Sequence, residues 1–434
     1  MSDKRTLVVG TTPDYIAYID RNFPKRCLFL TDIEKRKFSR EIKPDSDSEI
    51  VCDLQNSDQV LTALQYHLED NNQQLSGVAC YDCESLVLAA QIAEYFKLPF
   101  PSVASIKLSR DKFLTKKKWI EYGVRCPKVE LVHSGWQAFR LIEQFNSSVV
   151  LKPTHGSGSE LVFHCHDNAD LSFAYHELRV GLAQRSNSPL YRTTIMSDKN
   201  QSDEHPVLAE EFVEGREYSA DFIIENNSVQ IIRISKKLSN HELPFGTTTA
   251  YIIPAKLPEW LDIETLKTNL FQAASSLGFT RAICMVDFMI TKKEVVFLEL
   301  TPRTGGDCLP PLIKHCSGVD TIEVELDFAD GKSLHIPPQE QWIEHVGLRL
   351  FAEQSGRLKS VDFSQLEGNE SIKEIFLKFE VGHEIILPPE DYDSWILGHV
   401  IFEPTGSMPL IEECKSLLDK IYIQVEQQYV QKIN

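Results

Sequence analysis

The chain has 434 residues, of which 42% are hydrophobic and 25% are charged, and its formal net charge is −18. A chain of this length exceeds what one hydrophobic core usually serves, so we expect roughly two to four domains or subdomains. The negative charge argues against nucleic acid or an anionic membrane surface as the main partner. It does not argue against a phosphorylated small molecule, because lysines and Mg²⁺ neutralise phosphates locally.

No targeting signal is visible in the sequence. The stretch 1–10 holds too few apolar residues for a signal peptide, and no apolar run is long enough to span a bilayer. The ten cysteines are scattered, and Cys27, Cys80 and Cys284 lie within apolar, strand-like runs. This pattern is typical of buried, reduced thiols. We therefore expect a cytoplasmic protein.

The N-terminal part of the chain alternates strand-like and helix-like segments. Apolar runs at 6–10, 27–30 and 77–81 predict buried strands, and 84–97 has apolar residues at helical spacing. Strands that alternate with helices predict a parallel sheet of the α/β class. Gly10, which ends the first strand, does not open a GxGxxG pattern, so the dinucleotide-binding fingerprint is absent.

The middle of the chain begins after the proline-rich break at 99–101. A basic segment there predicts a helix that ends near Gly123, and residues 149–153 predict a short strand followed by a small, flexible loop at 154–159. The next predicted elements are a polar surface insertion (184–206), three strands (207–213, 217–224 and 229–234) and an amphipathic helix (263–277). After about residue 330, a last segment holds a predicted strand at 346–351 and a predicted polar helix at 412–430.

Residues 286–307 carry the most informative pattern. Two apolar segments flank the turn-like residues 291–294 and predict a hairpin, with Asp287 near the start of the first segment and Glu299 near the end of the second. Folding back brings both carboxylates to one end, and Mg²⁺ usually takes one or two carboxylates plus substrate phosphates. Arg303, shortly after, suits a developing phosphoryl or acyl-phosphate charge. We therefore predict a reaction site for a nucleoside triphosphate; the alternative is a pair of solvated surface acids.

A second pattern suits phosphate binding. Gly156 and Gly158 let the backbone bend close to a polyanion and offer unobstructed amides. Lys152 closes an otherwise apolar strand, where a lysine is costly to bury unless it meets an anion. A plain turn is the alternative for the glycines, and surface solvation is the alternative for the further candidates Lys112 and Lys236.

A third pattern suits the base and sugar of a nucleotide. Residues 208–217 predict a strand, a tight glycine turn and a second strand. The free backbone groups at such an edge can pair with the edge of adenine. Glu217, just past the turn, could accept hydrogen bonds from ribose hydroxyls.

The order of these motifs resembles that of the ATP-grasp ligases, which include D-alanine–D-alanine ligase, biotin carboxylase and carnosine-synthase-type amino acid ligases. The motifs are Lys112, VLKP with its GSGS loop, EEFVEGREYS, and VDF…FLELTPR, and the likeness reaches to about Leu312. The resemblance implies an α/β ATP-grasp fold with two α+β subdomains that clasp ATP. Its implied domains are an N-terminal α/β domain (1–107), the ATP-grasp domain (108–330, with subdomains 108–190 and 205–330) and a C-terminal α+β domain (331–434).

The resemblance also implies which residues bind the phosphates. Lys112 and Lys152 match the two lysines that contact them, and Lys236, with Lys237 as the alternative, resembles a third. The mobile glycine-rich loop of the family matches Gly156, Ser157, Gly158 and Ser159.

Further matches cover the remaining parts of the site. The adenine hinge matches Glu210, Glu211 and Val213, and the ribose-binding glutamate matches Glu217. The two carboxylates for Mg²⁺ (or Mn²⁺) match Asp287 and Glu299, and the arginine beside the reacting carboxyl matches Arg303. One position departs from the family, which usually has asparagine two residues after the second carboxylate. Thr301 stands there, and its hydroxyl is a poorer metal ligand than an amide oxygen.

The activity implied by the resemblance is ADP-forming ligation: ATP activates a carboxylate, which an amine then attacks, with amino acids as the expected substrates. Asp307, after the paired glycines of the same loop, is a candidate for holding a substrate ammonium; the alternative for the glycines is a loop that needs positive φ values. The alternatives are a carboxylase or a coenzyme A thiol ligase of the same fold, and a non-catalytic ATP-binding sensor that the Thr301 departure would suit. The implied partners are small-molecule carboxylates and amines, and a homodimer is common among similar proteins.

Overall fold

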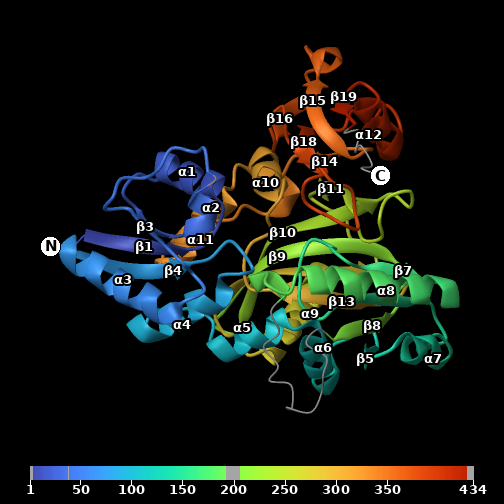
Figure 1. The fold of residues 1–434 in the computed structure, drawn as a ribbon, viewed down its shortest axis with the longest axis horizontal. Coiled ribbons are helices and arrows are strands. Elements are labelled where there is room, and N and C mark those ends of the chain that lie inside the picture. Colours follow the sequence, from blue (N-terminus) through green and yellow to red (C-terminus); the bar gives the residue numbers. More distant parts are fainter. Residues whose placement is uncertain (1–2, 38, 192–205, 428–434) are drawn as a thin grey trace, which may run out of the picture.

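The computed structural model describes residues 3–37, 39–191 and 206–427. Its strands form four sheets, and the chain runs from an N-terminal sheet at one end, through two central sheets, to a small C-terminal sheet (Figure 1). Within these ranges, no helix combines the length and the apolar character that crossing a bilayer requires. All ten cysteines are free, and all except Cys52 are buried.

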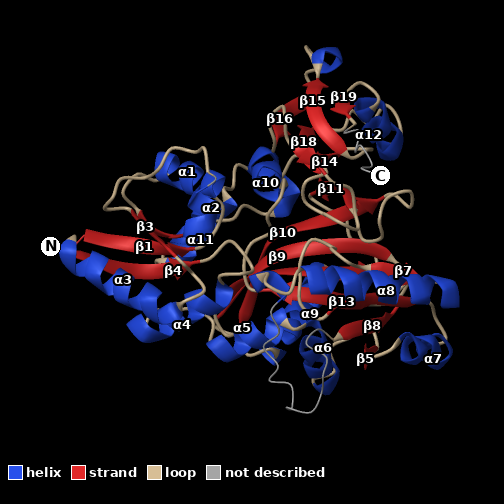
Figure 2. Ribbon diagram, in the orientation of Figure 1, coloured by secondary structure: helices blue, strands red, loops and turns tan. Residues whose placement is uncertain are grey.

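The N-terminal sheet has the strand order β3-β2-β1-β4, and all its neighbours are parallel, as predicted. Its elements are β1 (Asp3–Val9), α1 (Pro13–Asn22), β2 (Cys27–Asp32), α2 (Ile33–Lys37), β3 (Glu49–Cys52), α3 (Ser57–Asp70), β4 (Gln73–Ala79) and α4 (Leu86–Phe96). Because side chains alternate along a strand, Leu7 packs with α3 and α4 on one face while Val8 packs with α1 on the other. The helices therefore cover both faces of this sheet (Figure 2).

Two helices lead from this sheet to a small antiparallel sheet with the order β5-β8-β6-β7. The elements are α5 (Val103–Arg110), α6 (Lys112–Glu121), β5 (Val129–Val132), α7 (Gly135–Phe145), β6 (Val149–Pro153), β7 (Phe163–Cys165), α8 (Asn168–Gln184) and β8 (Val207–Glu211). The Asp111 carboxylate accepts hydrogen bonds from two backbone amides of α6 and so caps its start. Of the predicted insertion at 184–206, residues 189–191 form a 3₁₀ turn, while 192–205 lie outside the described residues.

The largest sheet has eight antiparallel strands in the order β13-β12-β9-β10-β11-β14-β18-β16. Its strands are β9 (Arg216–Glu225), β10 (Ser228–Ser239), β11 (Thr248–Ile253), β12 (Ala282–Ile290), β13 (Val295–Thr301), β14 (His345–Phe351), β16 (Ile372–Leu377) and β18 (Ile396–Phe402). The helices between them are α9 (Ile263–Ser276), which was predicted, α10 (Leu309–Ser317) and α11 (Thr321–Ala329). Three strands that follow residue 330, β14, β16 and β18, thus extend this eight-stranded sheet.

The rest of the C-terminal segment forms a small sheet, β17-β15-β19, made of β15 (Gly356–Asp362), β17 (Glu384–Ile385) and β19 (Tyr422–Glu426), with α12 (Leu410–Leu418) beside it. The predicted polar helix at 412–430 is therefore confirmed as far as Leu418 and wrong over 419–427. The Tyr-Ile-Gln-Val-Glu run of β19 is rich in residues that favour strands, and it pairs antiparallel with β15. Long-range pairing has overridden the local helical signal, and residues 428–434 lie outside the described part.

Helix α11 shows why sequence boundaries and packing units differ. It packs in the core of the N-terminal sheet, with Ile322 and Leu326 beside Val8. Gly77 of β4 approaches it so closely that a Cβ there would lie 2.1 Å from the Ala329 carbonyl oxygen. The predicted boundary at 107/108 falls within α5, and the boundary at 330/331 falls just after α11. The domain division stays a prediction.

Candidate active site

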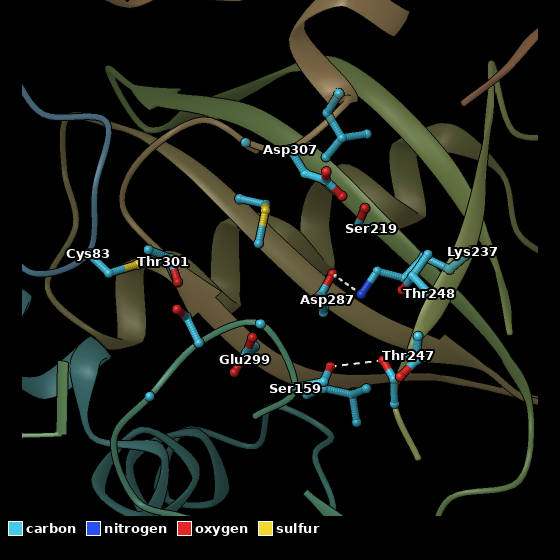
Figure 3. A pocket seen from close by; sticks show the side chains of 18 of the residues that line it. Cys83, Ser159, Ser219, Lys237, Thr247, Thr248, Asp287, Glu299, Thr301 and Asp307 are labelled. Atoms are coloured by element: carbon cyan, nitrogen blue, oxygen red, sulfur yellow. Dashed lines mark hydrogen bonds and ion pairs between the residues drawn. The ribbon is translucent and has the colours of Figure 1, made fainter. Parts of the chain in front are cut away.

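The predicted hairpin forms, and Asp287 of β12 pairs with Glu299 of β13. The turn between the strands is closed by a hydrogen bond from the Thr291 amide to the Glu294 carbonyl, 3.0 Å long. A register shift follows Asp287, a local irregularity of the kind that re-aims side chains. Figure 3 shows both carboxylates in the same pocket, with Lys237 reaching Asp287.

The two carboxylates have different electrostatic surroundings. Burial raises the pKa of Asp287 to about 6, and the neighbouring Glu299 and Glu217 carboxylates add to the rise while Lys237 opposes it. Burial acts in the same direction on Glu299, but Lys112 and other nearby lysines outweigh it and hold its pKa below the usual range. Paired buried carboxylates repel each other, so this pair favours a cation.

These residues fit a divalent cation shared with phosphate. Asp287 Oδ1 is buried and accepts no hydrogen bond from the described residues, although Lys237 Nζ lies 3.0 Å away. No group of three or more His, Cys, Asp or Glu side chains in the described chain could hold a metal ion by itself. Two carboxylates completed by substrate phosphates are a usual environment for Mg²⁺. Thr301, opposite Met285 on the same hairpin, lines the pocket as well.

Three lysines, from α6 and from β6, lie close to the carboxylates of Glu299 and Glu210. Lys112 Nζ donates to the Gly156 carbonyl at 2.8 Å and lies 3.4 Å from Glu299. Lys152 Nζ lies 2.8 Å from Glu210 Oε2, and Lys116 Nζ lies 2.7 Å from Glu210 Oε1. Lys116 was not predicted.

The signal that could have found Lys116 is the inward face of α6. Thr115, Lys116 and Trp119 are the buried residues of that helix, and the spacing of Lys116 and Trp119 places them on one side. Burial lowers the pKa of Lys116 to about 8 despite the opposing effect of Glu210. Lys116 therefore contacts the site through Glu210 and lines neither chamber itself.

On β10, Lys237 rather than Lys236 reaches the acids. Lys237 Nζ lies 2.7 Å from Glu217 and 3.0 Å from Asp287. Burial lowers its pKa, but the two carboxylates raise it more, so this lysine is firmly charged. Lys236 lines the larger chamber described below, without an ion pair among the described residues.

The glycine-rich loop bends over this cluster. Gly158 has φ +70° and Ser159 has φ +61°, conformations that glycine adopts more readily than other residues. Ser159 Oγ donates to the Gly246 carbonyl at 2.8 Å. The loop is thereby joined to the β10–β11 connection.

Two chambers meet at the carboxylate pair. The larger has a volume of about 700 Å³ and the smaller about 260 Å³. Both are lined by Lys112, Gly156, Ser157, Ser159, Asp287 and Glu299. The larger one alone is lined by Lys152, Glu210, Glu211, Val213, Glu217 and Lys236, and the smaller one alone by Gly158, Thr301 and Arg303. Every residue predicted for the site thus lines at least one chamber.

The hinge side of the larger chamber retains hydrogen-bonding capacity. Glu210 Oε1 is buried and accepts no aligned hydrogen bond from the described residues. The amide of Glu211 donates to the Lys128 carbonyl at 2.9 Å, so it is already used. Val213 follows in the connection to β9, where backbone groups are not part of a sheet. Base recognition by these residues stays a prediction, as does ribose binding by Glu217.

The smaller chamber is built around Arg303. Its Nε lies 3.2 Å from Cys83 Sγ, in the connection between β4 and α4, and its Nη1 donates to the Thr304 carbonyl at 2.7 Å. The next residue, Gly305, donates its amide to Asp221, and a Cβ there would lie 2.8 Å from Arg233 Nη2. Only glycine lets the loop come this close.

Several residues of the smaller chamber were not predicted because they come from the C-terminal segment. They are Arg349, Phe351, Tyr392, Trp395 and Ile396. Arg349 Nε lies 2.8 Å from Asp307 Oδ2, so Asp307 already has a cationic partner. No local pattern links these residues to Arg303, because only the shared central sheet brings them together.

Comparisons with known proteins agree with this geometry. Residues 145–311 match the ATP-grasp domain family. A D-alanine–D-alanine ligase of Ralstonia pickettii is 23% identical over 267 residues, which span 58% of this chain and 72% of that protein.

Two solved structures resemble nearly the whole chain. An L-amino acid ligase from Bacillus licheniformis has a TM-score of 0.74 at 17% identity, covering 98% of this chain and 100% of that one. A biotin carboxylase from Campylobacter jejuni, solved as a β-γ-ATP complex, has a TM-score of 0.63 at 16% identity, covering 98% of this chain and 93% of that one. These likenesses show the fold. Residues 145–311 of the chain therefore match an ATP-grasp domain, and the whole chain shares the fold of these ligases and carboxylases.

Proposed function

We propose that this protein is an ATP-dependent, ADP-forming ligase that activates the carboxylate of an amino acid as an acyl phosphate and couples it to an amine. The observation that carries the proposal is the position of Asp287 and Glu299 where the two chambers meet. A triphosphate in the larger chamber and a carboxylate in the smaller one would face each other across this pair. The relatives named as D-alanine–D-alanine ligase and L-amino acid ligase support the same reaction class.

The chain's own residues account for most of the chemistry. A carboxylate is a poor electrophile, and transfer of the γ-phosphoryl group gives it a good leaving group. Lys112, Lys152 and the amides of the glycine-rich loop would bind the phosphates and spread the charge of the transferring group. Bound Mg²⁺ would neutralise phosphate oxygens beside Asp287 and Glu299.

The smaller chamber would hold the reacting carboxyl. Arg303 would orient it there and stabilise the oxyanion that forms when the amine attacks. Closure of the loop, joined to Gly246 through Ser159, would exclude water and protect the acyl phosphate from hydrolysis. The products would be an amide, ADP and phosphate.

Hydroxylamine tests the activation step without knowledge of the natural amine. The protein is incubated with ATP, Mg²⁺, pooled L-amino acids or other carboxylates, and hydroxylamine, and hydroxamate and ADP are measured. We expect hydroxamate with at least one pool, and we expect Asp287→Asn or Glu299→Gln to abolish both products. Undiminished turnover in these variants would contradict the proposal.

The same assay separates the other candidates. A carboxylase would form ADP with bicarbonate, and a thiol ligase would form it with coenzyme A in place of hydroxylamine. Tight ATP binding without turnover across broad carboxylate and amine pools would indicate a nucleotide sensor, the function that Thr301 in place of asparagine would suit. We place the reaction in the cytoplasm, and the free, mostly buried cysteines are the support for that compartment.

A further inference from the structure

Arg110 and Arg349 line the smaller chamber besides Arg303, and the proposed reaction uses neither. Arg110 donates to the Leu190 carbonyl at 3.2 Å. Arg349 comes from β14 and lines the chamber together with Arg303, and only 13% of its side chain is exposed. The carboxyl that is activated needs one cation, which Arg303 supplies. Burying another cation is costly unless an anion meets it. Arg349 therefore requires its own counter-charge.

Asp307 balances that charge but does not use all the hydrogen-bond donors of the guanidinium. Its Oδ2 lies 2.8 Å from Arg349 Nε, yet this Nε makes no aligned hydrogen bond with any described residue. Arg349 Nη1 donates to the Thr248 carbonyl at 2.9 Å. A guanidinium offers five N–H donors in a fixed fork that matches a carboxylate. Part of this fork is thus left for an incoming anion.

The surroundings of Arg349 strengthen such a contact. Its guanidinium carbon lies 5.2 Å from the centre of the Phe351 ring, and that ring lies 4.7 Å from the ring of Trp395. Ile396 completes this largely apolar wall of the chamber. Hydrogen bonds between charged groups are stronger where the local dielectric constant is low. An anion bound here would be held firmly and beside apolar side chains.

We propose that Arg349 binds a carboxylate of the acceptor, so that the amine which attacks the acyl phosphate is itself an amino acid. This inference rests on the proposed ligase function, since only a ligase has an acceptor. The donor's reacting carboxyl faces Arg303 and the nucleotide, whereas Arg349 lies at the apolar wall with donors of its fork unused, where the other substrate can reach it. Asp307 is a positioning residue that keeps the guanidinium turned into the chamber, and its pairing with Arg349 replaces the ammonium-binding role considered from the sequence.

Matched acceptors test the proposal. With the donor found in the hydroxylamine assay, acceptors are offered as L-alanine against L-alaninamide and L-phenylalanine against L-phenylalaninamide, with hydroxylamine as a reference that lacks a carboxylate. We expect wild-type kcat/KM to favour at least one acid over its amide by about tenfold to a hundredfold, the size of a charge-assisted hydrogen-bond contribution. In Arg349→Gln this preference should fall to about one, through a higher KM for the acid.

Controls separate binding from structure. Arg349→Lys keeps the charge but not the fork, so it should retain part of the preference, and Arg357→Gln, at an exposed arginine of β15, should retain all of it. Wild-type protein that uses acids and amides equally well would overturn the proposal. So would an Arg349→Gln variant that loses rate equally with acid, amide and hydroxylamine. If Arg349→Gln does not fold, the wild-type comparison and Arg349→Lys decide. Absence of hydroxamate with every donor would instead contradict the ligase function.

Discussion

Replacing Glu210 by glutamine should destabilise the protein strongly, because this carboxylate forms ion pairs with two buried lysines. Lys116 and Lys152 lie 2.7 and 2.8 Å from its two oxygens. The exposed side-chain fractions are 0% for Lys116, 4% for Glu210 and 10% for Lys152. Removing one partner of a buried ion pair costs about 3–5 kcal/mol. For a domain of about 150–250 residues this corresponds to a fall in Tm of about 6–20 °C.

A double-mutant cycle checks the origin of this cost. Lys116→Met leaves one acid facing one lysine, so Glu210→Gln in the Lys116→Met background strands one cation rather than two. We expect the double variant to be more stable than Glu210→Gln alone, with a coupling energy of about 1 kcal/mol or more. Glu211→Gln is the matched control: its partner Lys128 lies 3.5 Å away and is 58% exposed, so the loss should stay below about 1 kcal/mol.

The pH dependence adds an independent measurement. Burial lowers the pKa of Lys116 to about 8, so the folded state binds fewer protons than the unfolded state above that pH. Stability therefore rises with pH from about 8 towards the ordinary lysine pKa near 10.4. Without Glu210 this window should begin at lower pH. Thermal unfolding of wild type and Glu210→Gln at several pH values measures the loss of stability and the shift of this pH window. The KM for ATP shows whether the lysines still bind phosphate. A Glu210→Gln variant as stable as wild type would refute the reasoning. So would a double variant whose loss of stability equals the sum of the losses in Glu210→Gln and Lys116→Met.

Three further changes should have measurable effects. Burial raises the pKa of Glu325 from 4.5 to about 7, so between these pH values the folded state holds a proton that the unfolded state has lost. The free energy of unfolding should therefore fall as the pH rises from 4.5 to 7, by at most about 3 kcal/mol. Glu325→Gln should flatten this pH dependence in thermal unfolding. Thr301→Asn restores the ligand usual in the family, so half-maximal ADP formation should need several-fold less Mg²⁺, and an unchanged requirement would argue against Thr301 as a ligand. Gly305→Ala forces a Cβ to within 2.8 Å of Arg233 and shifts the Arg303 loop. We expect kcat to fall about tenfold or more, with little change in the KM for ATP. In the control Gly135→Ala the nearest neighbour of the new Cβ lies 4.0 Å away, so kcat and KM should stay unchanged.

Local patterns gave much of the fold. Helix α9 and the 286–307 hairpin rest on interactions between residues close in sequence, so spacing and turn residues were sufficient to predict them. The pairings of the N-terminal sheet are long-range, such as Thr6 with Gly77, but the alternation of strands with helices was enough to predict that the sheet is parallel. The helix predicted at 412–430 ends at Leu418, because β19 is held by pairing with β15, which is distant in sequence. Helix α11 likewise joins the N-terminal core only through tertiary packing.

The candidate site also has features that local sequence patterns predict and features that depend on tertiary packing. The sequence by itself determined the motif residues and their order, because each motif is a short segment whose chemistry depends on neighbours along the chain. Only the tertiary structure decided that Lys116 shares Glu210 with Lys152, that Lys237 rather than Lys236 reaches Asp287, and that Arg349 enters the chamber of Arg303. Such contacts depend on how strands from separate segments align in one sheet and on which side chains burial then forces together, and neither is encoded in local spacing.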